Sequence, residues 1–148
     1  MDRAVRVLRE GGCDPVYVVL GAWSGDVPGA IVVANPEWPE GMGSSLRAGL
    51  TALEGAPVDA AVVTLVDLPG LTPAAVRRLV ETDAGIAAAT YDGERGHPVR
   101  FGRGHWAGVA GAARGDAGAR DYLRAHADEV TLIQVGDVAS GEDLDEPA

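Results

Sequence analysis

The chain contains no lysine, and all twelve of its basic residues are arginine. Any mechanism that needs a lysine from within these 148 residues is therefore excluded. Its single cysteine, Cys13, has no second cysteine to pair with, which favours a reducing compartment such as the cytoplasm. Because no partners for a nucleophilic cysteine are evident, we expect Cys13 to be a packed or surface thiol.

Long apolar runs are also missing. No run approaches the roughly 20 residues of a membrane span, and the first residues predict a charged helix rather than a signal peptide. Acidic residues outnumber basic ones by 22 to 12, giving a net charge of −10. This charge argues against nucleic acid or an anionic membrane as a partner, since both need basic patches. An anionic substrate would need local help from arginine, helix N-termini or a divalent cation.

What is present is the composition of a compact α/β protein, with 47% hydrophobic residues and 21 glycines. Hydrophobic periodicity and turn residues predict alternating helices and strands. The predicted helices cover 2–10, 44–53, 73–80, 106–113 and 119–127, and the predicted strands cover 15–21, 30–34, 59–66, 85–91, 97–101 and 130–135. We therefore expect one layered α/β domain over residues 1–148, with a mixed sheet that includes a hairpin over 85–101.

Helix starts are marked by two signals. Thr72 followed by Pro73 is typical of an N-cap and first helical residue. Ser44 or Ser45 is the expected cap of the helix that runs to Leu53.

Asp67 is the most informative residue, because this carboxylate closes the otherwise apolar run 60–66. Such a run is typical of a strand buried on both faces of a mainly parallel sheet, and ligands of these sheets collect at the carboxyl ends of the strands. Asp67 is thus a candidate metal ligand. The alternative is an acid that caps the following turn.

The loop 40–47 places two glycines and two serines just before a helix. Its backbone N–H groups can grip a phosphate or a ribose with help from the helix dipole and Arg47. An ordinary capped turn explains the same pattern.

Three further polar residues have ordinary explanations as well. Asp145 fits a solvated acidic tail, His97 a turn histidine, and Asp116 a helix N-cap. Two carboxylates at the ends of neighbouring strands, however, would make a hard-oxygen site for Mg²⁺, which favours Asp67 and Asp145 together.

Five segments taken in order carry a family resemblance. They cover residues 35–49, 67–73, 95–99, 115–120 and 143–147. In this order they resemble the MobA-like NTP transferases, specifically the molybdenum cofactor cytidylyltransferase branch. The resemblance implies a three-layer α/β/α Rossmann-like nucleotidyltransferase fold with a mostly parallel mixed sheet. It also implies transfer of CMP from CTP to molybdopterin, with Mg²⁺ and release of pyrophosphate, and a molybdoenzyme as a possible protein partner.

The resemblance also implies roles for individual residues. Asp67 would be the catalytic Mg²⁺ ligand that bridges the nucleotide phosphates, and Asp145 a second acid at the metal. The residues on the nucleotide side would be Asn35, Gly41, Met42, Gly43, Ser44 and Ser45. The residues on the pterin phosphate side would be His97, Asp116 and Arg120. Phosphoryl transfer depends mainly on positioning and charge neutralisation, which these residue types supply.

The match departs from the family at both ends. Family members open with a strand and a loop of the form L-A-A-G-x-G-x-R-x-G-x-x-K, and this sequence begins after that loop. Glu146 stands where the family usually has Thr. We expect a late-assigned start or a fragment, with impaired activity in this chain.

The strand absent from the match would lie between the strands predicted at 15–21 and 59–66. Those strands must then pair directly, leave an apolar slot, or accept a strand from another chain. Unpaired buried backbone groups cost about 1–3 kcal/mol each, so an empty slot is the least stable of these arrangements.

Two other functions stay open from the sequence. One is a non-catalytic domain that binds molybdopterin or a partner enzyme, and the other is a nucleotidyltransferase acting on another phosphorylated substrate. The segments 95–99 and 115–120 favour the molybdopterin branch.

Overall fold

The computed structural model describes residues 2–21, 25–66, 68–113 and 118–140. The α-helices are α1 (Asp2–Glu10), α2 (Met42–Leu53), α3 (Pro73–Glu81), α4 (Trp106–Ala112) and α5 (Arg120–Ala125). The strands are β1 (Tyr17–Leu20), β2 (Ile31–Ala34), β3 (Ala60–Val63), β4 (Ile86–Tyr91), β5 (Glu94–Gly102) and β6 (Val130–Gln134). Short 3₁₀ turns occupy Trp38–Glu40, Arg103–His105 and Ala127–Glu129.

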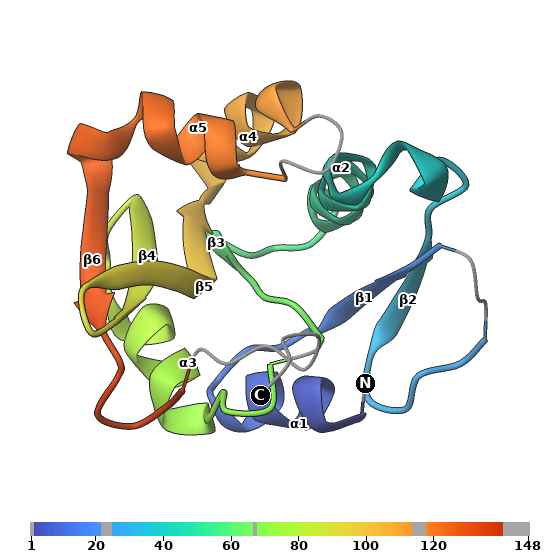
Figure 1. The fold of residues 1–148 in the computed structure, drawn as a ribbon. Helices are drawn as coiled ribbons and strands as arrows, with labels where there is room; N and C mark the ends of the chain where they lie inside the picture. The colour runs from blue at the N-terminus through green and yellow to red at the C-terminus, as the bar shows by residue number, and fades with distance from the viewer. Residues whose placement is uncertain (1, 22–24, 67, 114–117, 141–148) are drawn as a thin grey trace.

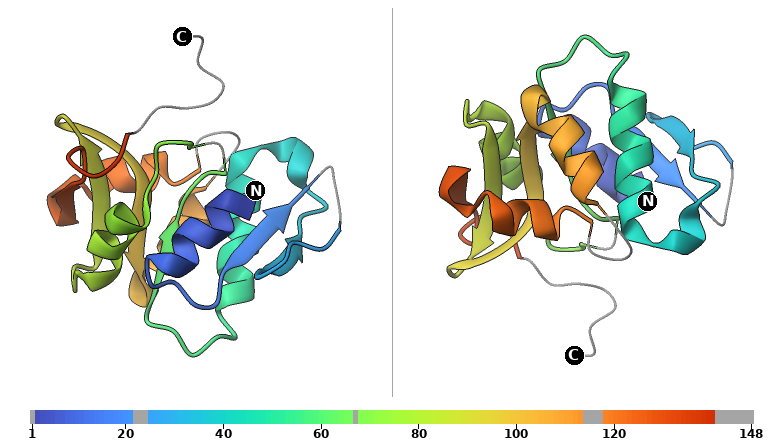
Figure 2. Two further views of the ribbon diagram at one scale, coloured as in Figure 1. Left: turned by 90° about the horizontal axis from the view of Figure 1, so that it is seen from below. Right: turned by 90° about the horizontal axis from the view of Figure 1, so that it is seen from above.

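The elements form three layers. Figure 1 shows α1 and α3 on one side of the strands, and α2, α4 and α5 on the other. The two views in Figure 2 show the same separation from below and above. The predicted α/β/α layering is therefore confirmed. Among the described residues, no helix is both long enough and apolar enough to cross a bilayer.

The strands form two hydrogen-bonded groups. Four of them lie in the order β3-β5-β4-β6, and β1 pairs separately with β2. The β1–β2 and β4–β6 pairs are parallel, whereas β5 runs antiparallel to both of its neighbours. This arrangement confirms the expected mixed sheet with a β4–β5 hairpin.

The core lies on both faces of the four-stranded group. One cluster packs Phe101 and Ile86 against Val109 of α4 and Leu50 of α2. Alternate residues of β4 point to the other face, where Ala87 and Ala89 pack with residues of α3. All five residues from Ile86 to Thr90 are buried, as expected for a central strand covered by helices on both sides.

The start of α3 forms as predicted, whereas the hairpin turn is shorter than expected. Thr72 is the N-cap of α3, and its side-chain oxygen accepts a hydrogen bond of 3.3 Å from the Ala75 amide. Asp92 and Gly93 both have positive φ, 54° and 86°, and close a two-residue turn, so β5 begins at Glu94 rather than at the expected His97.

The predicted serine cap of α2 is wrong. The helix begins at Met42 with Gly41 as its N-cap and no side-chain cap bond, so Ser44 and Ser45 already lie within its first turn. The hydroxyl of Ser44 instead lies 2.8 Å from the Gly41 carbonyl oxygen and 2.9 Å from that of Glu37. Bonding back to the preceding loop removes this hydroxyl from the capping role.

The alternative explanation of Asp116 as a helix cap is also wrong. Helix α5 begins at Arg120, and its N-cap is Ala119. Asp116 itself lies outside the described residues.

The third correction concerns β3, which ends at Val63 rather than Val66. Val63 pairs with Val99 of the antiparallel strand β5, so Thr64 would stand opposite Pro98. Proline has no amide hydrogen to donate to the ladder, and pairing stops there.

Candidate functional site

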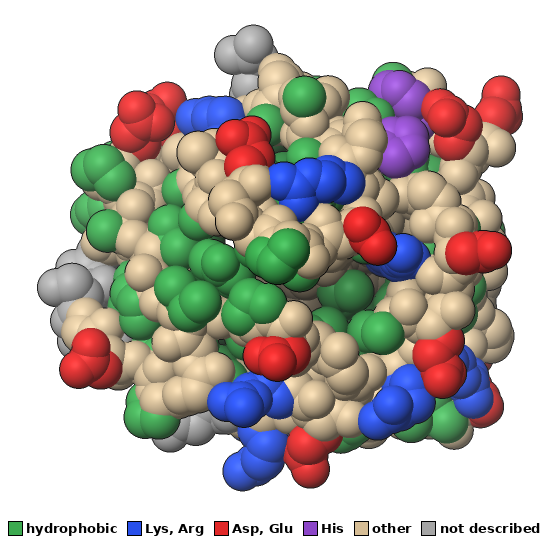
Figure 3. Space-filling view, turned by 180° about the vertical axis from the view of Figure 1, so that it is seen from behind, with side chains coloured by type: hydrophobic (Ala, Val, Ile, Leu, Met, Phe, Trp, Pro, Cys, Tyr) green, Lys and Arg blue, Asp and Glu red, His purple; other side chains and the backbone are tan. Residues whose placement is uncertain are grey.

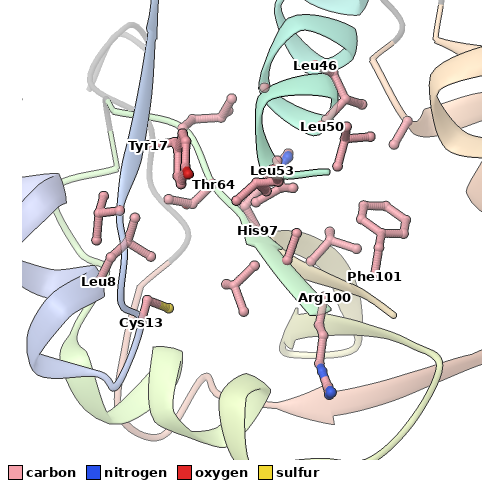
Figure 4. Close-up of a pocket in the computed structure, with 18 of the residues that line it drawn as sticks. Leu8, Cys13, Tyr17, Leu46, Leu50, Leu53, Thr64, His97, Arg100 and Phe101 are labelled. Carbon is pink, nitrogen blue, oxygen red and sulfur yellow. The ribbon is translucent and has the colours of Figure 1, made fainter. Parts of the chain in front are cut away.

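A cavity of about 750 Å³ separates β1 from β3. Apolar residues of α1 and α2 close it from the two helical layers, and Figure 4 shows Leu8 on one side with Leu46, Leu50 and Leu53 on the other. The two strands therefore do not pair directly. Of the three arrangements considered from the sequence, the structure has the apolar slot. This is the one expected to be least stable, because it leaves buried backbone groups unpaired. The difference arises because β1 is held by β2, and β3 by β5, each on the edge away from the cavity.

Asn35, which is only 3% exposed, fixes the loop before α2. Its Nδ2 group donates to Ser44 Oγ and to Ser45 Oγ, each at 3.0 Å. Its Oδ1 accepts from the Glu37 amide at 3.0 Å. Both Nδ2 hydrogens are thus used within the protein, which makes Asn35 the residue that holds this loop in shape.

Arg47, expected to help hold a phosphate, has protein partners in the structure. Its guanidinium lies 3.8 Å from a Glu37 carboxylate oxygen and 3.9 Å from one of Glu40. It also donates to the Ala113 carbonyl oxygen. The two acids offset its charge, so its attraction for an anion is reduced.

Residues from the predicted nucleotide side and the predicted pterin side line the same cavity. Met42 and Ser45 line it from the start of α2, and His97 and Arg120 line it from β5 and α5. The two sides approach closely, because a Cβ on Gly118 would lie 3.3 Å from the Met42 sulfur. The other predicted nucleotide-side residues are Gly41, which is the cap of α2, and Gly43 and Ser44, which are buried.

His97 is half-buried on β5, and its side chain is labelled at the cavity in Figure 4. Burial lowers the pKa of His97 below its usual value, so its imidazole is neutral at pH 7. Its carbonyl oxygen accepts a hydrogen bond of 2.5 Å from the Tyr91 hydroxyl. That bond ties β5 to β4 at a residue that lines the cavity.

The three predicted acids, Asp67, Asp116 and Asp145, lie outside the described residues. The described residues that follow Asp67 and those that precede Asp145 are hydrogen-bonded to each other. The Ser140 amide donates to the Gly70 carbonyl oxygen at 3.0 Å. Thr72 Oγ1 also donates to the Val138 carbonyl oxygen at 2.8 Å. Within the described ranges, no group of three or more His, Cys, Asp or Glu side chains is placed to hold a metal ion.

Two cavity residues had no role assigned from the sequence. Thr64 lines the cavity, and its Oγ1 is buried with no hydrogen-bond partner among the described residues. The sequence does contain a signal for Thr64, because it is the one polar residue of the run 60–66. Cys13 also lines the cavity, and burial raises the pKa of its thiol to about 11. Of the two expected states, a packed or a surface thiol, the structure therefore has the packed one.

Comparison with known sequences gives two matches that cover most of the chain. The family of MobA-like NTP transferase domains matches residues 1–130. Nicotine blue oxidoreductase of Paenarthrobacter nicotinovorans is 37% identical over 161 residues, covering 98% of this chain and 78% of that protein.

Solved structures share the fold. The Rv0371c homologue from Mycobacterium sp. strain JC1 matches with a TM-score of 0.75 and 26% identity, covering 94% of this chain and 74% of that one. The complex of Rv0371c from Mycobacterium tuberculosis H37Rv with manganese matches with a TM-score of 0.73 and 24% identity, covering 88% and 73%. A family match over residues 1–130, together with a relative at 37% identity, shows that this chain belongs to the MobA-like NTP transferases and is a nucleotidyltransferase.

Proposed function

We propose that this nucleotidyltransferase transfers CMP from CTP to the terminal phosphate of molybdopterin and releases pyrophosphate. One structural observation supports the proposal more than any other. Met42 and Ser45, from the segment expected to bind nucleotide, line the same cavity as His97 and Arg120, from the segments expected to bind the pterin phosphate. A transferase must bind both substrates next to each other, so that the reacting groups are in contact.

Under this proposal the protein holds and orients its two substrates. The backbone at the start of α2 would bind the nucleotide, since Asn35 fixes that loop through Ser44 and Ser45. Arg120 would pair with the pterin phosphate. The neutral imidazole of His97 would hydrogen-bond to that phosphate or to the pterin without adding charge.

We assign the metal to Asp67 and Asp145, with Mg²⁺ as the ion. Carboxylate oxygens suit this hard cation, which when bound neutralises charge on the nucleotide phosphates. Two observations support the assignment: the hydrogen bond between Gly70 and Ser140, which joins segments next to the two acids, and the manganese in the Rv0371c complex. CTP and molybdopterin are the proposed substrates, and a molybdoenzyme is the proposed recipient of the product.

The test is a pyrophosphate-release assay on the purified chain with CTP, molybdopterin and Mg²⁺. We expect release that needs all three components and falls when ATP or GTP replaces CTP. No release with CTP, but release with another nucleotide or another phosphorylated acceptor, would contradict the cytidylyltransferase assignment. Arg120→Gln should raise the KM for molybdopterin more than that for CTP, whereas Arg124→Gln, on the exposed face of the same helix, is the matched control.

A second candidate activity comes from the relative at 37% identity, which is an oxidoreductase of nicotine blue. The same protein preparation should be incubated with nicotine blue and NADH or NADPH, and its visible absorbance followed. Turnover of the dye without pyrophosphate release would favour this second function over the first.

A further inference from the structure

The charged side chains that line the cavity are mostly basic, although the chain as a whole is acidic. Among the described residues they are Arg95, Arg100 and Arg120, with Asp14 as the single carboxylate. The whole chain has a net charge of −10. Figure 3 shows the hollowed face of the molecule on which hydrophobic side chains gather. Basic side chains beside apolar ones concentrate positive potential at one place, and such a place attracts anions.

Most of the described arginines are held by other parts of the protein. Arg78 forms two hydrogen bonds to the Asp137 carboxylate, and Arg103 donates to backbone carbonyl oxygens just after α2. Arg100 is held as well, because its guanidinium donates to the Thr82 carbonyl oxygen at 2.5 Å. Figure 4 shows the Arg100 side chain directed away from the other labelled residues.

Arg95 and Arg120 differ from these arginines. Both are exposed residues that line the cavity, and neither has an ion pair or a side-chain hydrogen bond within the described ranges. They come from separate elements, because Arg95 belongs to β5 and Arg120 begins α5. The donors of both guanidinium groups are therefore available to a ligand in the cavity.

Nearby acids do not offset these two charges. Glu94 and Asp121 are their neighbours in the sequence, but neither acid lines the described cavity or forms an ion pair with them. Asp14 lines the cavity without forming an ion pair to a described arginine.

Arg47, beside the predicted nucleotide loop, has the opposite surroundings. Its guanidinium lies within 3.9 Å of carboxylate oxygens of both Glu37 and Glu40. The uncompensated positive charge of the cavity lining thus lies with Arg95 and Arg120, in the segments expected to bind the acceptor.

A terminal phosphate monoester matches two free guanidinium groups. It carries a charge of about −1.5 to −2 at pH 7 and three acceptor oxygens. Each guanidinium presents its N–H donors in a planar fork that suits two such oxygens. A phosphodiester or a sulfate ester has one negative charge, which a single arginine offsets.

We propose that Arg95 and Arg120 form a two-arginine subsite, in which Arg95 is a specificity-determining residue that selects acceptors ending in a phosphate monoester over acceptors with a monoanionic end. The proposal deepens the proposed function and rests on it for the place of the acceptor. It adds Arg95, and a rule for the charge of the acceptor, to the roles already assigned.

The test measures binding of phenyl phosphate to the purified chain by isothermal titration, without CTP or Mg²⁺. The titration is done at about pH 8, where a phosphate monoester is a dianion. Phenyl sulfate and methyl phenyl phosphate carry the same ring with one negative charge and are the control ligands. We expect saturable binding of phenyl phosphate and at least about tenfold weaker binding of both controls, because a charge-assisted contact is lost.

Substitutions then assign the effect to Arg95. Arg95→Gln should weaken binding of phenyl phosphate about tenfold and change binding of phenyl sulfate less, so that the preference narrows. Arg95→Lys keeps the charge without the planar fork, so its affinity should fall between those of Arg95→Gln and wild type. The fold should persist in both variants, because Arg95 is exposed and has no described partner, and thermal unfolding checks this.

The matched control is Arg124→Gln. Arg124 is exposed on α5 and does not belong to the described cavity lining, so this variant should bind phenyl phosphate as wild type does. In the transfer assay, Arg95→Gln should raise the KM for molybdopterin and leave the KM for CTP unchanged.

Four binding results would overturn the proposal. These are no binding of phenyl phosphate at millimolar concentration, equal affinity for phenyl phosphate and phenyl sulfate, unchanged affinity in Arg95→Gln, or an equal loss in Arg124→Gln. Because the titration contains neither CTP nor Mg²⁺, failure of the cytidylyltransferase assay would leave these readings unchanged. Conversely, pyrophosphate release with the same KM for molybdopterin in Arg95→Gln and wild type would overturn the role of Arg95 and leave the proposed function intact.

Discussion

Asn35 Nδ2 donates a 3.0 Å hydrogen bond to Oγ of Ser44, nine residues further along the chain. The bond is buried, and it links the end of β2 to the first turn of α2. The loop between them is the segment expected to bind nucleotide, so one side chain determines the shape of that side of the site.

Asn35→Ala should therefore destabilise the protein and weaken nucleotide binding. The substitution leaves the Glu37 amide and the Ser45 hydroxyl without their partner, which costs about 1–3 kcal/mol in the free energy of unfolding. Urea unfolding followed by circular dichroism measures this loss. Ser45→Ala removes only one of the three bonds and should cost less; an Asn35→Ala protein as stable as wild type would contradict the role of Asn35.

Asp67→Asn tests the proposed metal ligand. The change removes the charge and keeps the shape, so we expect Mg²⁺-dependent CTP binding to be lost while the unfolding midpoint stays close to that of wild type. Isothermal titration with and without Mg²⁺ measures the first, and thermal unfolding the second. Asp59→Asn, an exposed acid just before β3, should leave binding intact. Equal Mg²⁺-dependent affinity in Asp67→Asn and wild type would remove Asp67 from the site.

Thr72→Ala tests the start of α3. The threonine side chain caps the Ala75 amide and also donates to the Val138 carbonyl oxygen, so its loss should cost about 1–2 kcal/mol. Denaturant unfolding gives the difference. Thr51→Ala lies at an exposed position in α2 and should change stability by less than about 0.5 kcal/mol. A similar loss in both variants would show that the cap contributes nothing specific.

His97 should make stability fall at acid pH. Its pKa is lowered by burial in the folded protein, whereas in the unfolded chain it lies at about 6.5. The unfolded state therefore binds the proton more readily, and stability present above pH 6.5 is lost as the pH falls through the folded pKa. NMR titration should give a His97 midpoint below 6.5. In His97→Gln, the decrease in stability between pH 7.5 and pH 5 should be smaller; an unchanged decrease would exclude His97 as its source.

The sequence predicted the elements that depend on neighbouring residues. Helix α1 occupies 2–10 as expected, Thr72 and Pro73 begin α3, and a hairpin joins β4 to β5, although its turn is shorter than expected. Each of these depends on a few consecutive residues, through apolar periodicity, a capping hydroxyl or tolerance of positive φ.

Predictions failed where a distant residue competes for the same group. Ser44 does not cap α2, because its hydroxyl is bonded to the loop that Asn35 holds. Strand β3 stops at Val63, because the residue facing the next position is Pro98 of a strand more than 30 residues away. The partner lies nine residues away in the first case and more than 30 in the second, and neither contact follows from the pattern of apolar residues.

The sequence by itself determined the α/β class, the alternation of elements and the family, since apolar periodicity and ordered motifs are properties of the chain read in one direction. Only the tertiary structure decided which residues share a site. It placed Met42, Ser45, His97 and Arg120 in the lining of one cavity, and it left β1 and β3 on either side of that cavity with Thr64 in its wall. The physical reason is that strand pairing and burial depend on which segments meet in space, and hydrogen-bond partners across a sheet are not encoded by their separation along the chain.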